Sequence, residues 1–170
     1  MKRSLVLSAL FLLSTAWIAV NGQGMKASPS ASASKMIDGL KIEINYHQPG
    51  VKGRKIWGGL VPYGQVWRTG ANNATTFEVN QDVTLNGNKL PAGKYALFTI
   101  PGENEWTVIL NSDNAQWGAF NYDAGKDVLT FKVTPETGSE MVERMTFDIT
   151  DSGKVNFSWE NLKFSFDVKG

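Results

Sequence analysis

From residue 40 to the end of the chain, short stretches alternate apolar and polar side chains, which is the pattern of β-strands with one buried face. In the first stretch, Leu40, Ile42, Ile44 and Tyr46 are separated by lysine, glutamate and asparagine. Because successive side chains of a strand point to opposite faces, each stretch should bury one face of a sheet. The same alternation recurs in 129–133, 145–149, 155–159 and 164–168.

Two further stretches, 95–100 and 106–110, are apolar on both faces and are predicted to lie in the middle of a sheet. Turn-forming residues stand between the predicted strands. Glycine preceded by proline or by a short polar residue predicts hairpin turns at Asn86-Gly87, at Pro101-Gly102 and at 151–153.

No stretch repeats apolar residues at helical spacing over three turns with a cap and a stop. At most one short helical turn is predicted, near Asn114 to Gly118. About eight to ten short strands at regular spacing instead predict an all-β domain. A single antiparallel β-sandwich or jelly-roll-like domain is favoured over an open sheet, because stacking or closure hides the apolar faces and limits exposed edges.

The first residues of the chain follow a different pattern. Lys2 and Arg3 precede an uncharged apolar run from Leu5 to Val20, and small residues follow up to Gly22. This order is typical of a secretory signal peptide, here 1–22. A membrane anchor is the alternative, but the run is shorter than the roughly 20 residues that a spanning helix needs. We therefore expect an exported protein, periplasmic or secreted, with no membrane span after cleavage.

Cleavage would make Gln23 the first residue of the mature chain. Residues 23–35 are small and polar with one proline, which predicts a flexible lead-in. One domain should then occupy 36–170, since no repeat or composition shift marks a second boundary and 170 residues are few for two domains. No feature of the sequence indicates an oligomeric state.

Composition removes several classes of function. The chain has no cysteine, which excludes disulfides, thiolate metal sites and a cysteine nucleophile. Loss of the signal peptide changes the formal net charge from +1 to −1 and leaves no basic run, so neither nucleic acid nor anionic lipid is a predicted partner. The single histidine excludes a histidine metal cluster, and no dense Asp-x-Asp spacing indicates calcium. No metal or cofactor is predicted.

Catalysis finds little support in the residues. The one histidine, His47, is interpreted as a strand-end residue, because no nucleophile-elbow motif accompanies it. A carboxylate-dependent hydrolase remains an alternative, since a pair of carboxylates can cleave glycosides and five acidic residues gather in mid-chain at positions that look like turns. No catalytic residue is assigned. The five acidic residues are Glu103, Glu105, Asp113, Asp123 and Asp127.

The segment 46–76 does not have the pattern of a framework, because glycines, prolines, cations, amides and tryptophans are interleaved in it. Such a mixture suits a recognition loop. The guanidinium of Arg68 can bind a carboxylate or phosphate through two hydrogen bonds, and the nearby amides and indoles suit sugar hydroxyls and ring faces. The alternative is a buried arginine that ties loop carbonyls together. The candidate ligand-binding residues are Tyr46, Arg54, Trp57, Arg68, Asn72, Asn73, Thr76 and Trp117, of which Trp57 and Trp117 are the tryptophans expected to be exposed.

Several long runs carry a family resemblance. They are GRKIWGGLVPYG at 53–64, VWRTGAN at 66–72, LPAGKYALFTIP at 90–101, WTVI at 106–109 and the pair Trp117-Gly118. These runs resemble a family of exported bacterial proteins, common in Bacteroidetes, that is known only as a domain of unknown function. The resemblance implies no catalytic residue. His47 and Gln48 stand before Pro49 where the family pattern implies serine and arginine.

Together these patterns favour an exported protein that binds a polar small molecule, a glycan or an envelope partner through 46–76. A structural or interaction module of the cell envelope is the first alternative, and the hydrolase is the second. A concave pocket that holds Arg68 and Asn72 would favour binding. A carboxylate pair in one cleft would favour hydrolysis, and a flat, filled surface would favour a scaffold.

Export gives the first testable prediction. Mass spectrometry of the periplasmic or secreted product should show a chain that lacks about its first 22 residues, because small residues follow the apolar run. Recovery of the intact chain from the membrane fraction would contradict the prediction.

Overall fold

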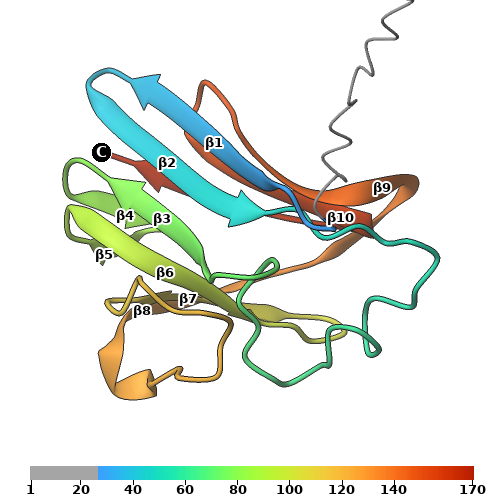
Figure 1. The fold of residues 1–170 in the computed structure, drawn as a ribbon. Helices are drawn as coiled ribbons and strands as arrows, with labels where there is room; N and C mark the ends of the chain where they lie inside the picture. The colour runs from blue at the N-terminus through green and yellow to red at the C-terminus, as the bar shows by residue number, and fades with distance from the viewer. Residues whose placement is uncertain (1–26) are drawn as a thin grey trace, which may run out of the picture.

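The computed structural model describes residues 27–170, so the predicted signal peptide lies outside the described residues. It shows two antiparallel sheets packed face to face, as predicted (Figure 1). One sheet has six strands in the order β1-β2-β3-β6-β7-β8, and the other has four in the order β5-β4-β10-β9. The strands are β1 (Ser30–Ile37), β2 (Leu40–His47), β3 (Thr75–Val79), β4 (Val83–Leu85), β5 (Asn88–Leu90), β6 (Gly93–Ile100), β7 (Trp106–Asn111), β8 (Asp127–Val133), β9 (Glu136–Ile149) and β10 (Lys154–Lys169).

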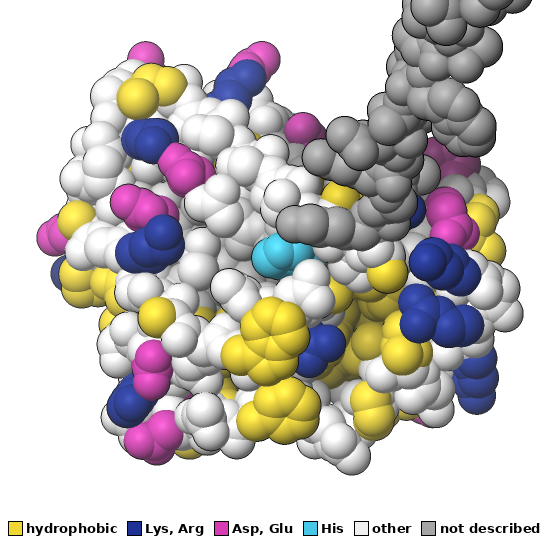
Figure 2. Space-filling model, in the orientation of Figure 1, with side chains coloured by type: hydrophobic (Ala, Val, Ile, Leu, Met, Phe, Trp, Pro, Cys, Tyr) yellow, Lys and Arg dark blue, Asp and Glu magenta, His cyan; other side chains and the backbone are white. Residues whose placement is uncertain are grey.

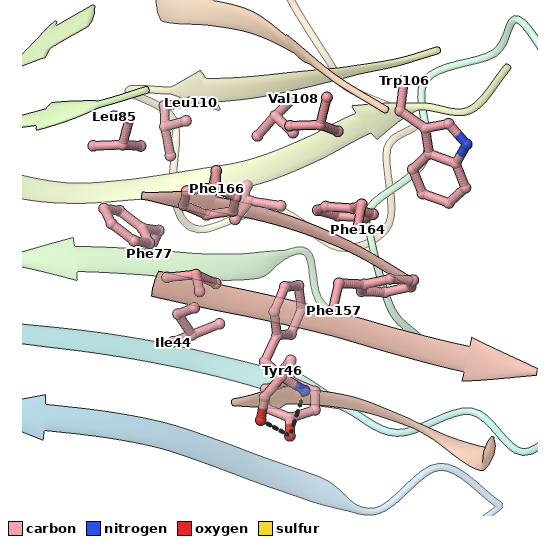
Figure 3. Close-up of a cluster of buried hydrophobic side chains, with 14 of the residues drawn as sticks. Ile44, Tyr46, Phe77, Leu85, Trp106, Val108, Leu110, Phe157, Phe164 and Phe166 are labelled. Atoms are coloured by element: carbon pink, nitrogen blue, oxygen red, sulfur yellow. Dashed lines mark hydrogen bonds between the residues drawn. The ribbon is translucent and has the colours of Figure 1, made fainter. Parts of the chain in front are cut away.

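The apolar positions of the alternating stretches meet between the two sheets. Ile42 and Ile44 of β2 are fully buried, while Lys41 and Glu43 lie on the outer face and form an ion pair. Figure 3 shows aromatic side chains of both sheets in this core. The rings of Phe157 and Phe164, for example, are stacked with their centroids 4.6 Å apart. The predicted period-two faces therefore build one continuous core.

Strands β6 and β7 lie inside the larger sheet, which confirms the prediction for the two stretches that are apolar on both faces. Their outward residues, such as Phe98 and Ile109, are covered by the loop that follows β7, where Ala119 and Tyr122 pack on them. Burial and a 2.6 Å hydrogen bond to Asp127 raise the pKa of the Tyr122 hydroxyl. The phenol therefore stays protonated and holds this loop on the sheet.

Two predicted hairpin turns have the expected chemistry. Asn86 and Gly87 join β4 to β5 with φ values of 46° and 83°, the left-handed pair that a type I′ turn requires. The segment 151–153 joins β9 to β10. The predicted helical turn is in the wrong place, because the one short helix of the described residues is a 3-10 turn at Ala124–Lys126. The side chain of Asp123 caps it by accepting a hydrogen bond from the Gly125 N–H.

The predicted flexible lead-in is also wrong over most of its described part. Residues 30–35 belong to β1, which pairs with β2 from Ser30↔His47 to Ile37↔Leu40. Ala31 and Ala33 pack against the core, and the alternating Ser30, Ser32 and Ser34 face outward. Alternating alanine and serine is a period-two pattern, but its apolar side chains are too small to distinguish it from a linker. The ordered domain thus begins before the predicted residue 36.

The stretches 155–159 and 164–168, predicted as separate strands, are parts of the single strand β10. Between them the register with β9 shifts, and Glu160 has a φ of 56°. At this bulge β9 carries extra residues that pair with the chain beyond β2. The Met145 N–H donates to the Pro49 carbonyl at 3.1 Å, and the Val51 N–H donates to the Glu143 carbonyl at 2.8 Å. The bulge therefore fixes the first part of the glycine-rich segment 46–76, which we call the recognition segment.

Candidate ligand-binding site

Four tryptophans join the recognition segment to both sheets. Trp57 packs edge-on against Trp106 of β7 at 5.0 Å and against Trp159 of β10 at 5.6 Å between ring centroids. Trp67 stacks on Trp159 at 5.8 Å with an interplanar angle of 17°. The expected exposure of Trp57 is wrong, since the residue is 9% exposed because these rings enclose it. Trp67, in contrast, keeps part of its surface accessible.

Hydrogen bonds inside the segment hold the residues that follow Trp67. Trp67 and Thr99 exchange backbone hydrogen bonds of 2.8 and 2.9 Å, and the hydroxyls of Thr69 and Thr99 lie 3.0 Å apart. The Thr75 hydroxyl donates to the Thr69 carbonyl at 2.7 Å. All three threonines are fully buried. Since buried hydroxyls are costly to leave without partners, this network fixes the backbone on both sides of Arg68.

These constraints leave a cleft of about 330 Å³ beside Arg68. Its polar side chains include Arg54, Arg68 and Asn72; Trp67 supplies aromatic surface, and Trp159 lies almost fully buried in the wall. Figure 2 shows hydrophobic side chains on either side of an isolated basic group in the lower part of one face of the molecule. Among the described residues the cleft wall contains no aspartate or glutamate; its other residues are Ser28, Pro49, Leu60, Val61, Gly70 and Ala71.

Within residues 27–170, the Arg68 side chain has no hydrogen-bond or ion-pair partner that would explain its position. Its Nε is buried and makes no hydrogen bond within 27–170, and none of the five ion pairs found there involves it. Burial partly removes the charge from water and so lowers the pKa of the guanidinium. A partly desolvated cation without a carboxylate is suited to receive an anion from outside.

The arginine that ties loop carbonyls together is Arg54. Its Nε donates to the Val51 carbonyl at 3.1 Å, and its Nη2 donates to the Gly50 carbonyl at 2.5 Å. The structural role considered for Arg68 is thus performed by its neighbour in the cleft wall. Trp159 also belongs to the cleft wall but is only 1% exposed, and its buried Nε1 makes no hydrogen bond among the described residues.

The remaining predicted site residues do not all join this cleft. Asn73, Thr76 and Tyr46 line a separate depression of about 180 Å³, together with His47, on the larger sheet. The ring of Tyr46 points into the core (Figure 3), where its hydroxyl accepts from the Phe147 N–H at 3.1 Å and bonds the Phe147 carbonyl at 3.4 Å. This hydroxyl holds β2 to β9, and burial raises its pKa.

Asn72 and Asn73 separate because the backbone turns between them. Asn72 has a φ of 59°, a left-handed conformation that asparagine tolerates better than most residues. Asn73 then pairs with Trp117, and the Asn72 carbonyl accepts from the Gly118 N–H at 3.0 Å. Trp117 is 62% exposed, as predicted, and lies beside the cleft rather than in its wall.

Eight of the eleven wall residues were not among the candidate residues, and three of the eight show why. Ser28 stands in the supposed lead-in, where nothing distinguishes it from the other serines. Trp159 belongs to an alternating stretch, a pattern that indicates a core residue. Leu60 stands in a Gly-Gly-Leu-Val run whose exposure no periodicity reveals. These three residues lie far apart in the sequence, and only the packing of the folded domain brings them into one cleft wall.

The five acidic residues of the hydrolase alternative are absent from the cleft wall. Glu105 pairs with Lys132 at 3.0 Å, and Asp113 pairs with Lys126 at 2.8 Å. Asp123 caps the 3-10 turn, and Asp127 accepts from the Tyr122 hydroxyl. Glu103 is exposed in the hairpin between β6 and β7. These partners support turn roles for the four paired or capping residues.

Within 27–170 no cluster of three or more His, Cys, Asp or Glu residues is arranged to hold a metal ion. The same residues contain no helix with the length and apolar character of a membrane span. A family model described as "Protein of unknown function (DUF2911)" matches residues 28–168. The chain belongs to this family.

The DUF2911 match begins at the cleft residue Ser28 and ends near the end of β10, so it includes both sheets and the whole cleft wall. No curated protein and no solved structure matches the chain. Membership in the DUF2911 family therefore brings no activity with it, and function must be argued from the geometry of the cleft.

Substitution of the two arginines of the cleft wall should affect the free energy of unfolding differently. Arg54→Ala should lower the free energy of unfolding by about 1 kcal/mol, because the Gly50 and Val51 carbonyls lose their donors. Arg68→Lys should change it by less than about 0.5 kcal/mol, because the Arg68 Nε makes no hydrogen bond within 27–170. Urea unfolding of both variants measures the difference. A loss of about 1–3 kcal/mol in Arg68→Lys would show that Arg68 is a structural strut.

Proposed function

We propose that this DUF2911 protein is exported and binds a small organic anion in the cleft, with the ligand carboxylate on the Arg68 guanidinium. The observation that carries the proposal is a half-buried arginine that forms no ion pair among the described residues, in a cleft whose described wall holds no acidic side chain. A guanidinium can bond both oxygens of a carboxylate, and such charged pairs are about twice as strong as neutral hydrogen bonds. Asn72 would orient the ligand through its amide.

The size and lining of the cleft support a small ligand. Its volume of about 330 Å³ lies at the small end of the range of about 300–1,000 Å³ that is usual for small-molecule sites. Trp67 and Leu60 give the wall an apolar part that a simple inorganic anion would not use. Arg54 already donates hydrogen bonds to two backbone carbonyls, so Arg68 is the main cation left to bind an anion. This arrangement favours an organic carboxylate over a phosphate group, whose higher charge calls for more cations.

Rigidity of the wall also supports binding. The buried threonine network and the Trp67–Trp159 stack fix the backbone before any ligand arrives. A preformed site loses little conformational entropy on binding, so a ligand with few contacts can still be retained. A structural envelope module gives no role to this concave surface with its arginine. A hydrolase would need a pair of carboxylates, and the described wall of the cleft contains none.

Isothermal titration with small carboxylates tests the proposal. D-galacturonate and benzoate should bind the wild-type protein, whereas D-galactose and benzamide should bind more weakly because they lack the anionic oxygens. Arg68→Lys should weaken carboxylate binding about 10-fold or more, since lysine keeps the charge but loses the planar pair of donors. Lys154→Arg, a conservative exchange of an exposed cation outside the cleft wall, is the control and should bind as the wild type does.

Binding that is equal in wild type and Arg68→Lys would contradict the proposed role of the cleft. Absence of binding by every carboxylate in the panel would contradict the function itself. Unfolding curves of each variant separate a lost ligand contact from a lost fold.

A further inference from the structure

Two exposed aromatic residues lie next to the Arg68 cleft. Phe120 is 82% exposed, the highest value among the large apolar side chains of 27–170, and Trp117 is 62% exposed. Both belong to the loop between β7 and β8. Solvent-exposed aromatic rings beside a ligand cleft bring apolar surface that the fold itself does not bury.

The loop is held in place without using these two rings. Ala119 and Tyr122 pack on the outer face of the larger sheet, and the Tyr122 hydroxyl bonds Asp127. The backbone of Trp117 pairs with Asn73. Trp117 and Phe120 therefore project from an anchored loop, and they are not the side chains that secure it.

Gly118 connects this aromatic surface to the cleft. A Cβ placed on Gly118 would lie 2.9 Å from the Phe120 ring and 3.4 Å from Nη1 of Arg68. With a φ of 71°, the position also requires a left-handed backbone. The Phe120 ring and the Arg68 guanidinium are thus neighbours of the same glycine. A ligand held by Arg68 can extend onto the aromatic surface without leaving the protein.

We propose that the ligand is an acidic saccharide, with one sugar carboxylate on Arg68 and the adjoining sugar ring on a platform formed by Trp117 and Phe120. The inference rests on the proposed function and names its ligand class. Three features fit this chemistry together: a guanidinium for the carboxylate, the Asn72 amide and Ser28 hydroxyl for sugar hydroxyls, and flat aromatic faces for the C–H surface of a pyranose.

The cleft is less suited to a peptide. Peptides that bind by extending a sheet need a free strand edge with a row of N–H and C=O groups. Arg54, Leu60, Arg68 and Asn72 all lie in the wall but outside the named strands. Trp159 belongs to β10, which lies between β4 and β9. A saccharide needs no such edge.

Titration with defined oligomers tests the platform. The probes are galacturonate, its tetramer, neutral maltotetraose and tetraglutamate, which matches the tetramer in its repeated carboxylates. The tetramer should bind more tightly than the monomer. Trp117→Ala and Phe120→Ala should each weaken tetramer binding by about 2- to 10-fold and leave monomer binding unchanged, whereas Trp117→Phe should retain most of the affinity. Met36→Ala, at a residue 61% exposed on β1, is the control for loss of an exposed apolar side chain.

The outcomes distinguish this inference from the proposed function. If the monomer binds through Arg68 but the tetramer gains nothing and the platform variants have no effect, the platform is refuted and the function stands. If tetraglutamate binds as tightly as the acidic tetramer with the same dependence on Trp117, the ligand is a peptide and the saccharide assignment is wrong. If neither galacturonate nor any other carboxylate binds, both proposals fail.

Discussion

Trp57 and Trp67 pack against Trp106 of one sheet and Trp159 of the other, and this contact gives a glycine-rich segment a fixed shape. A chain with so many glycines and so little secondary structure would otherwise retain considerable conformational entropy. Aromatic pairs of this kind each contribute about 0.5–1.5 kcal/mol beyond the burial of their surface. The segment can therefore serve as a cleft wall because its tryptophans belong to the same core that joins the sheets.

The different roles of the two cleft arginines follow from this fixed frame. Arg54 lies next to the chain reversal after Pro49 and donates to its carbonyls, so its position is explained by the fold. Arg68 follows a tryptophan held in the stack and precedes a threonine held by buried hydroxyls. These two neighbours fix the position of Arg68 in the backbone. The Arg68 side chain itself forms no ion pair within 27–170. This difference is the basis for assigning ligand binding to Arg68.

Strand periodicity predicted the sandwich because a half-buried strand must alternate, as Leu40 to Tyr46 does, and the Asn86-Gly87 turn carried its own backbone signature. Prediction failed where side chains gave a weak signal or where distant contacts decided the outcome. The alanines of β1 are too small to indicate a strand. Trp57 is buried by residues far away in sequence, and the left-handed turn at Asn72 sends Asn73 to another surface. Periodicity reports local burial and cannot report either effect.

We propose above all that the fold positions the Arg68 guanidinium to bind a carboxylate. Nitrogen-15 NMR of the arginine Nε–H groups measures this directly, because Arg54, Arg68 and Arg144 can be assigned by substituting each with lysine. Addition of D-galacturonate should shift the Arg68 Nε–H resonance and slow its exchange with water, while the Arg54 resonance should change little because its Nε already donates to Val51. Binding of galacturonate that leaves the Arg68 resonance unchanged would contradict the account.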